Sequence, residues 1–320
     1  METLTQPGTS EVRIRKFEIG DLPQVAEIRN ASIAVSTDFY SMTVDRVRPP
    51  SEATDLELTS EILVADVGGK VRGYVHIYTD PSLMAQGRIN IDGLHVHPDF
   101  QRDGIGAKLL EAATAKATEW GGRYLSIAIP AGVVSSQTFL LKHHFQLVRY
   151  FWKLRHTSLT ELPAPTLPEG YTFRTFRQGI DEGAFLDLLN ASFADNWDFA
   201  PVSKEELERW KQRPDFNPKG CFFVSHGQAD VAVATVLLDR QQDVETLDGA
   251  ARIFEFGVLP EHRGKGVGYG ILLKAAQFAQ ANELPVLELV VDGHDDHAKA
   301  MYERVGFQEK RAILVFHKAL

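Results

Sequence analysis

The chain has 320 residues, 44% of them hydrophobic, and a formal net charge of -9 at pH 7. This length and hydrophobic content suffice for two cores of about 150 residues each, within the usual size range of a domain. The negative charge disfavours long-range attraction to nucleic acid or to an anionic membrane. Residues 1–10 are polar and no hydrophobic run reaches the roughly 20 residues that span a bilayer, so we expect a cytoplasmic protein without signal peptide or membrane helix.

The first half of the chain predicts strands interspersed with helices. Its opening strand is followed by an amphipathic helix that ends near Asn30-Ala31-Ser32. Gly68-Gly69 separates two alternating runs, which is typical of a hairpin. Ile105, Leu109 and Ala113 repeat at i, i+4 and i+8 and predict a helix that packs on a sheet. The expected strands of this half are residues 12–17, 61–67, 71–78, 89–96 and 124–129.

The second half predicts the same order of elements. Its first helix ends near Asn190-Ala191-Ser192, its hairpin turns at Gly227, and Val267, Ile271 and Ala275 form the matching helical stripe. Before it, residues 156–170 contain three prolines and no apolar periodicity, so we expect a linker there between domains at 11–155 and 171–320. The expected strands of this half are residues 171–176, 221–226, 231–238, 252–258 and 286–291.

A nine-residue pattern occurs in both halves. Pro-Asp-Phe-Gln-Arg-Asp-Gly-Ile-Gly at 98–106 matches Pro-Glu-His-Arg-Gly-Lys-Gly-Val-Gly at 260–268, 162 positions later. The Asn-Ala-Ser sequences match at an offset of 160, and Arg15 matches Arg174 at 159. A nearly constant offset over each half indicates an internal duplication. We therefore expect two tandem α/β domains, each with a mixed sheet.

The repeated loop has a chemical interpretation. Glycines that let the backbone curl at the start of a helix leave N–H groups free to bind phosphate oxygens, so we expect a cofactor with a diphosphate. A Walker loop is excluded, because neither Gly106 nor Gly268 is followed by Lys-Ser or Lys-Thr. A dinucleotide fingerprint also fails, because Tyr269 and Ile271 stand where its last glycine would be. What both copies share is Gln/Arg-x-x-Gly-x-Gly after a strand that ends in Val-x-Pro.

These loops resemble those of the GNAT superfamily of acyl-CoA-dependent N-acyltransferases, and the resemblance covers both halves. The sequence Asp295-x-x-Ala298-x-x-x-Tyr302-x-x-x-Gly306-Phe307 is similar to a later helix of that family, with Asp in place of Asn. The tandem layout looks like that of mycothiol synthase and related two-domain acetyltransferases, a likeness of architecture that does not identify the substrate. The resemblance implies acetyl-CoA as the cofactor and N-acetyl transfer as the activity. The residues it assigns to coenzyme binding are Phe256, Gly257, Val258, Arg263, Gly264, Lys265, Gly266, Val267, Gly268, Tyr269 and Asp295 in the second half, and Leu94, Val96, Gln101, Arg102, Asp103, Gly104, Ile105 and Gly106 in the first.

Two differences favour the second half as the catalytic one. Arg263 and Lys265 give its loop a formal charge of +2, whereas Arg102 and Asp103 cancel in the first loop, and a diphosphate is better held by cations. The position of Tyr302 is occupied in the first half by Leu140, which cannot donate a proton. The first half is then a scaffold or a non-productive coenzyme site. The alternatives are a first-half site with Asp92 as base, or two active sites.

Acetyl transfer requires groups that move protons and stabilise charge. Glu255 is our candidate for the base that accepts the amine proton, the other interpretation being an ion pair with Arg252. The resemblance places the oxyanion donor at the backbone N–H of Val258 and implies that Tyr302 assists the departing thiolate. Asp295 is also interpreted as a helix N-cap near the coenzyme.

The resemblance places the acceptor against residues 193–216, where Asp195 and Asp198 could attract an amine. A small-molecule primary amine is our first choice, followed by a peptide N-terminus or a lysine side chain. The other class considered is a non-catalytic acyl-CoA-binding regulator, and we expect a monomer or homodimer. The aromatic side chains of this segment, which could equally belong to a core, are Trp197, Phe199, Trp210 and Phe216.

Neither a disulfide nor a metal site is expected. Cys221 is the only cysteine, which excludes an internal disulfide, and its apolar surroundings indicate a buried strand thiol. His294, Asp295, Asp296 and His297 are adjacent but lack the i, i+4 ligand pair of a helical metal site.

Overall fold

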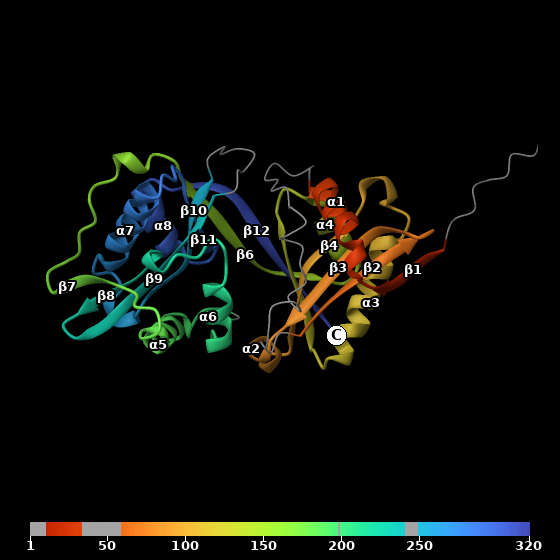
Figure 1. The fold of residues 1–320 in the computed structure, drawn as a ribbon, viewed down its shortest axis with the longest axis horizontal. Coiled ribbons are helices and arrows are strands. Elements are labelled where there is room, and N and C mark those ends of the chain that lie inside the picture. Colours follow the sequence, from red (N-terminus) through yellow and green to blue (C-terminus); the bar gives the residue numbers. More distant parts are fainter. Residues whose placement is uncertain (1–10, 34–58, 198, 241–248) are drawn as a thin grey trace, which may run out of the picture. The chain divides into compact units, whose positions relative to one another are not determined.

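The computed structural model describes residues 11–33, 59–197, 199–240 and 249–320 (Figure 1). The chain divides into two compact units. Unit 1 lies within residues 1–128, 135–146 and 315–320, and unit 2 comprises residues 129–134 and 147–314. Unit 2 therefore includes a strand from the first half of the sequence, and unit 1 includes the end of the chain. The boundaries 11–155 and 171–320 concern the two copies of the duplication and stay a prediction.

Unit 1 is built on a mixed sheet. Strands β1 to β4 pair in sequence order and antiparallel, and β5 pairs parallel to β4. The bounds of its strands are β1 (Val12–Lys16), β2 (Thr59–Val67), β3 (Lys70–Thr79), β4 (Arg88–Val96) and β5 (Tyr124–Pro130). Its helices are α1 (Leu22–Ile33), α2 (Pro81–Ala85), α3 (Ile105–Glu119) and α4 (Val134–Lys142).

Unit 2 repeats this plan with one additional strand. The order across its sheet is β6-β11-β10-β9-β8-β7, in which only β10 and β11 run parallel. The bounds of its strands are β6 (Gln146–His156), β7 (Tyr171–Thr175), β8 (Cys221–His226), β9 (Ala229–Asp239), β10 (Ala250–Val258) and β11 (Leu287–Asp292). Its helices are α5 (Glu182–Phe193), α6 (Lys204–Lys211), α7 (Val267–Ala281) and α8 (Asp296–Val305). The last strand, β12 (Gln308–Ala319), begins in unit 2 and ends in unit 1.

The sheet of unit 2 has a hydrophobic core on each face. On one face, α7 and α8 pack on Ala232, Ala234 and Val236 of β9. On the other face, α5 and α6 pack on Val233. Alternate residues of one strand thus serve opposite cores, as the two-residue period of a strand requires.

The helical stripes expected from the sequence are confirmed. All six stripe residues of α3 and α7 are at most 2% exposed: Ile105, Leu109, Ala113, Val267, Ile271 and Ala275.

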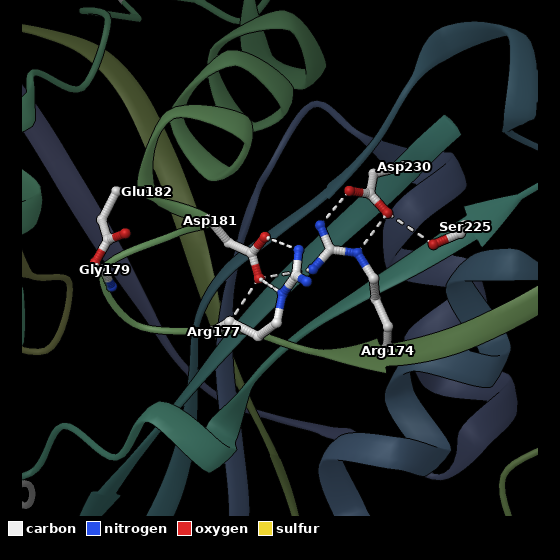
Figure 2. Close-up of polar contacts among 7 residues, drawn as sticks. All are labelled: Arg174, Arg177, Gly179, Asp181, Glu182, Ser225 and Asp230. Atoms are coloured by element: carbon white, nitrogen blue, oxygen red, sulfur yellow. Dashed lines mark hydrogen bonds and ion pairs between the residues drawn. The ribbon is translucent and has the colours of Figure 1, made fainter. Parts of the chain in front are cut away.

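The duplication is visible in a repeated ion pair between the first strand of each copy and the start of its first helix. In unit 2, Arg174 of β7 pairs with Asp230 of β9 and, at 2.9 Å, with Asp181 at the start of α5 (Figure 2). In unit 1, Arg15 of β1 pairs with Asp21 at 2.7 Å and Asp66 at 3.2 Å. A hydrogen bond from Arg15 lowers the pKa of Asp21, and hydrogen bonds from Arg177 and, to a smaller extent, from Arg174 lower the pKa of Asp181. The matched arginines thus tie the first strand of each copy to its neighbouring elements.

The segment 156–170 is part of the core of unit 2. Apart from a short 3-10 turn at Leu159–Glu161 it has no regular structure after β6 ends, as its prolines predict. Leu159 is 2% exposed, and its carbonyl accepts a hydrogen bond from the Gln280 side chain of α7. A Cβ on Gly270 would lie 2.5 Å from the Thr166 carbonyl oxygen, so the segment lies directly against the first turn of α7.

Cys221 is buried, as its surroundings predict, and burial raises the pKa of its thiol to about 11. Within the described ranges, no helix is both long and hydrophobic enough to cross a membrane.

Candidate active site

The repeated glycine loop of unit 2 joins β10 to α7 through a left-handed turn. Gly264 has φ 72° and Gly266, the N-cap of α7, has φ 87°. These values suit glycine, which lacks a Cβ. In the described part of the chain, the backbone N–H groups of residues 264–269 have no acceptor. The loop therefore presents a run of free donors at a helix N-terminus, which is the arrangement that binds phosphate.

The loop of unit 1 has the same backbone. Gly104 caps α3 with φ 80°, but the first left-handed position is taken by Arg102, with φ 75°. The N–H groups of residues 102–107 are free in the same way among described residues. Of the remaining expected coenzyme residues here, Leu94 and Val96 lie at the end of β4, Gln101 and Asp103 lie in the loop, and Ile105 and Gly106 open α3.

Arg263 has a structural role that its sequence context does not predict. Its Nε donates to the Val258 carbonyl at 2.9 Å and its Nη2 donates to the Ser192 carbonyl at 2.7 Å. In unit 1, Gln101 donates to the Val96 carbonyl at 3.1 Å, which is the matching contact. Both side chains hold the loop against the end of the preceding strand. The more available cation of the second loop is Lys265, which is exposed and makes no ion pair with a described residue.

Strand β10 separates from β11 just before the loop. The two strands pair only at Ala251 with Leu287 and Arg252 with Glu288 within the described chain, so the later residues of β10 have an open edge. The N–H of Leu259 bonds to Val231 of β9 at 3.0 Å. Because successive N–H groups of a strand point to opposite edges, the N–H of Val258 faces the open side. This is the orientation expected for an oxyanion donor.

A β-bulge orients Glu255. The pairing of β10 with β9 skips Phe254, so that Glu255 lies opposite Thr235 on the face covered by α5 and α6. Glu255 is half-buried and makes no hydrogen bond or ion pair with a described residue. Arg252, its alternative partner, instead pairs with Asp239 at 3.3 Å.

The surroundings of Glu255 favour its neutral form. Burial raises the pKa of Glu255 to about 8, and repulsion from Glu206 of α6 adds to the rise. Glu206 lies one turn before Trp210, whose ring centroid is 4.9 Å from that of Phe254, so this face of α6 packs beside the bulge. A carboxyl group with a pKa near neutrality is suited to accept and release protons at physiological pH.

The end of α5 packs directly on β10. A Cβ on Gly257 would lie 2.6 Å from the Cβ of Ser192, the last residue of the repeated Asn-Ala-Ser. The Ser192 hydroxyl is buried without a hydrogen-bond partner among described residues. In unit 1, His95 takes the position of Gly257, and its Nδ1 lies 2.7 Å from the Ser32 hydroxyl. The repeat thus marks a helix–strand contact in which glycine lets the helix approach the strand closely in unit 2, whereas a histidine side chain contacts the serine in unit 1.

Tyr302 lies in α8, whose N-cap is Asp295. The Asp295 carboxylate accepts a hydrogen bond from the Ala298 N–H at 2.8 Å, which confirms the predicted cap. Tyr302 is 8% exposed, and its ring centroid lies 6.3 Å from that of Phe256. Burial and the nearby Asp295 raise the pKa of its phenol, so the phenol keeps its proton.

The matching residue in unit 1 is Leu140. The Phe307 N–H bonds to the Tyr302 carbonyl at 3.1 Å, and the Phe145 N–H bonds to the Leu140 carbonyl at 3.0 Å. The identical backbone contact shows that Tyr302 and Leu140 are equivalent positions with different chemistry.

The aromatic residues of the acceptor segment serve different structural roles. Trp210 and Phe216 pack in the core between α5, α6 and the sheet. Phe199 stacks on Phe193 with centroids 6.0 Å apart, and Trp197 lies 5.5 Å from the Arg149 guanidinium. Asp195 is exposed, and Asp198 lies outside the described residues.

The family model described as the acetyltransferase (GNAT) family matches residues 29–145 and 184–307. The chain belongs to this family. It is an acetyl-CoA-dependent acyltransferase with a tandem GNAT layout and a mixed α/β fold, as its motifs predict. Among curated relatives, the mycothiol acetyltransferase of Thermobispora bispora is 31% identical over 270 residues, covering 82% of this chain and 87% of the relative. That of Salinispora arenicola is 29% identical over 332 residues, covering 98% and 99%.

Solved structures share the tandem fold. A GCN5-related N-acetyltransferase from Sphaerobacter thermophilus has a TM-score of 0.77 and 20% identity, covering 98% of this chain and 97% of its own. A tandem GNAT protein from the clavulanic acid biosynthesis pathway has a TM-score of 0.71 and 16% identity, covering 97% and 98%.

Proposed function

We propose that unit 2 transfers the acetyl group of acetyl-CoA to the primary amine of a small molecule by direct attack on the thioester. The observation that carries this proposal is Glu255, a partly buried carboxyl group without a partner in the described chain, whose pKa is about 8. It lies on the strand that leads to the free N–H groups of residues 264–269. A base and a phosphate-binding loop on one strand support acyl transfer at this point.

The residues of unit 1 support the choice of unit 2. After its own bulge at Asp92, unit 1 has Gly93 in the register position of Glu255. It has Leu140 in place of Tyr302, and His95 fills the position of Gly257. Unit 1 thus retains the loop but lacks three features that the transfer uses in unit 2.

The raised pKa of Glu255 lowers the cost of proton transfer. A primary ammonium group with a pKa of about 10.4 gives its proton to a carboxylate of pKa about 4.5 at a cost of about 8 kcal/mol, and to one of pKa about 8 at about 3 kcal/mol. At pH 7 about one Glu255 in ten is ionised, which costs about 1.4 kcal/mol. Even with this cost of ionisation included, proton transfer to Glu255 is about 3 kcal/mol less unfavourable than transfer to a carboxylate of pKa about 4.5. The environment of Glu255 therefore assists the reaction.

The other groups act on the thioester. The N–H of Val258 faces the open edge of β10 and stabilises the negative charge that develops on the carbonyl oxygen. The Tyr302 hydroxyl donates a hydrogen bond to the departing sulfur. Because the pKa of this phenol is raised above its usual 10, full proton transfer to a thiolate of pKa about 8.5 is unfavourable, and the thiolate takes its proton from solvent.

A small-molecule acceptor is supported by the relatives named mycothiol acetyltransferase. We test this by measuring thiol release from acetyl-CoA with a panel of amines that includes a deacetylated form of mycothiol, simple aminosugars, a peptide N-terminus and a lysine peptide. The proposal requires stoichiometric N-acetylation of a small amine and its loss in Glu255→Gln. Acetylation that is undiminished in this variant would refute the assignment of the base. Activity confined to the peptides would refute the acceptor class.

A further inference from the structure

A chain of hydrogen bonds crosses three strands of unit 1. The Ser60 hydroxyl of β2 lies 2.8 Å from His76 Nε2, and His76 Nδ1 lies 3.2 Å from an Asp92 carboxylate oxygen of β4. One proton arrangement satisfies all three groups: the hydroxyl donates to Nε2, and the Nδ1–H donates to the carboxylate. The imidazole is thereby positioned to accept a proton from serine.

The register of the sheet produces this alignment. His76 is directly opposite Gly93, and the bulge at Asp92 bends β4 at the adjacent position. Ser60 pairs with Tyr78, two residues beyond His76 along β3, so Ser60 and His76 are diagonal neighbours. The histidine is held between strands on both sides, and its side chain is only 13% exposed.

Unit 2 has different residues at the positions equivalent to His76 and Asp92. In unit 2, the register position of His76 is occupied by Thr235 and that of Asp92 by Phe254. Phe254 packs against Trp210, whereas Asp92 bonds to an imidazole. Unit 1 thus has a connected polar chain where unit 2 has an apolar contact. The acetyl transfer assigned to unit 2 uses none of its members.

We propose that Ser60 is the nucleophile of a second activity, the hydrolysis of small acetyl esters, with His76 as its base and Asp92 as the group that orients His76. A serine hydroxyl, an imidazole and a carboxylate connected in this order activate serine on unrelated folds. The geometry supplies both required contacts, at Nε2 and at Nδ1.

The reaction consists of two balanced steps. Ser60 Oγ bonds to the acyl carbon and its proton passes to His76. The bond from this carbon to the alcohol oxygen breaks, and the alcohol leaves with that proton. Water then attacks the acyl-serine and gives a proton to His76, which returns it to Ser60 Oγ as the acyl bond breaks. The products are an alcohol and acetic acid.

Because Asp92 is exposed, we expect its substitution to reduce ester hydrolysis less than substitution of Ser60 or His76. Its side chain is 68% exposed, and a solvated carboxylate orients an imidazole less firmly than a buried one. Ser60→Ala and His76→Gln should each reduce ester hydrolysis at least about tenfold, and Asp92→Asn should reduce it less. Glu255→Gln, which alters unit 2, should leave hydrolysis unchanged.

The test uses the full-length protein with p-nitrophenyl acetate and a fluorophosphonate probe. We expect hydrolysis above the buffer rate and a phosphonyl group on the peptide that contains Ser60, with fluoride released. Ser60→Ala should lose both while retaining amine acetylation and the denaturant unfolding curve of the native protein, which together show that both units are folded. Labelling of another residue, absence of labelling, or unchanged hydrolysis in Ser60→Ala would overturn the proposal.

Discussion

Replacing Glu255 by glutamine should lower activity and raise stability at alkaline pH. Glutamine keeps the size of the side chain but can neither accept a proton nor carry charge. General-base catalysis contributes about 10²- to 10⁴-fold, so we expect kcat to fall at least about 100-fold. The dissociation constant of acetyl-CoA should be nearly unchanged, because the coenzyme is assigned to the loop at residues 264–269.

The pH dependence follows from the same pKa. With a pKa of about 8, Glu255 is increasingly ionised as the pH rises, so kcat/KM of the native enzyme should rise about tenfold per pH unit below 8 and level off above it. In Glu255→Gln the break near pH 8 should disappear, and only the rise caused by deprotonation of the amine, with a pKa of about 10.4, should remain. Steady-state kinetics between pH 6 and 9 with a fixed amine measures both profiles.

Whereas kcat/KM rises with pH, the contribution of Glu255 to the free energy of unfolding falls. The pKa of Glu255 rises from 4.5 to about 8 on folding, so between these values the folded state binds more protons than the unfolded state. Stability therefore falls as the pH rises through this range, and the loss is complete above pH 8. At about 1.4 kcal/mol per unit the loss is at most about 5 kcal/mol. Glu255→Gln removes it at pH 9 and changes little at pH 4.

Denaturant unfolding at pH 4 and pH 9 checks this prediction. A variant that loses activity but is no more stable than the native protein at pH 9 would contradict the raised pKa. Unchanged kcat would contradict the catalytic assignment.

Three further substitutions test neighbouring contacts. Tyr302→Phe should lower kcat at least about tenfold, by loss of the hydrogen bond to sulfur, with the acetyl-CoA affinity measured by calorimetry nearly unchanged. Glu206→Gln should shift the limb of kcat/KM to lower pH by less than about one unit, because burial is the larger cause of the Glu255 shift; a shift to higher pH would be inconsistent with repulsion. Gly257→Ala should destabilise the fold by about 1–3 kcal/mol, since its Cβ would lie 2.6 Å from that of Ser192. Gly183→Ala, with no atom within 4 Å, is its control and should not destabilise α5.

The sequence predicted the features that depend on local spacing. Strands β1 to β5 and β7 to β11, the helical stripes at Ile105 and Val267 and the cap at Asp295 follow from periodicity and from the preferences of particular residues, whereas β6 and β12 were not predicted. The duplication strengthened these predictions because each feature occurs twice. The GNAT family followed from the same loops.

Features that depend on tertiary register were not predictable in this way. The bulge at Phe254 decides which face of the sheet Glu255 joins, and no local pattern marks it. Glu206 becomes a neighbour of Glu255 only when α6 packs on the sheet. Arg263 was assigned by charge to the diphosphate, but its position lets it bond to the Val258 carbonyl. Strand β6 pairs with β11 of the other half of the sequence. The alternation of apolar and polar residues along a strand does not specify its pairing partner.

The central claim is that the loop of unit 2 holds the coenzyme for acetyl transfer, and matched substitutions in the two loops test it most directly. Gly266 and Gly104 are equivalent N-caps with φ 87° and 80°. A carboxylate at Gly266 would repel a diphosphate, so Gly266→Glu should abolish amine acetylation while Gly104→Glu retains it. Acetylation that survives in Gly266→Glu and is lost in Gly104→Glu would place the reaction in unit 1 and contradict the account.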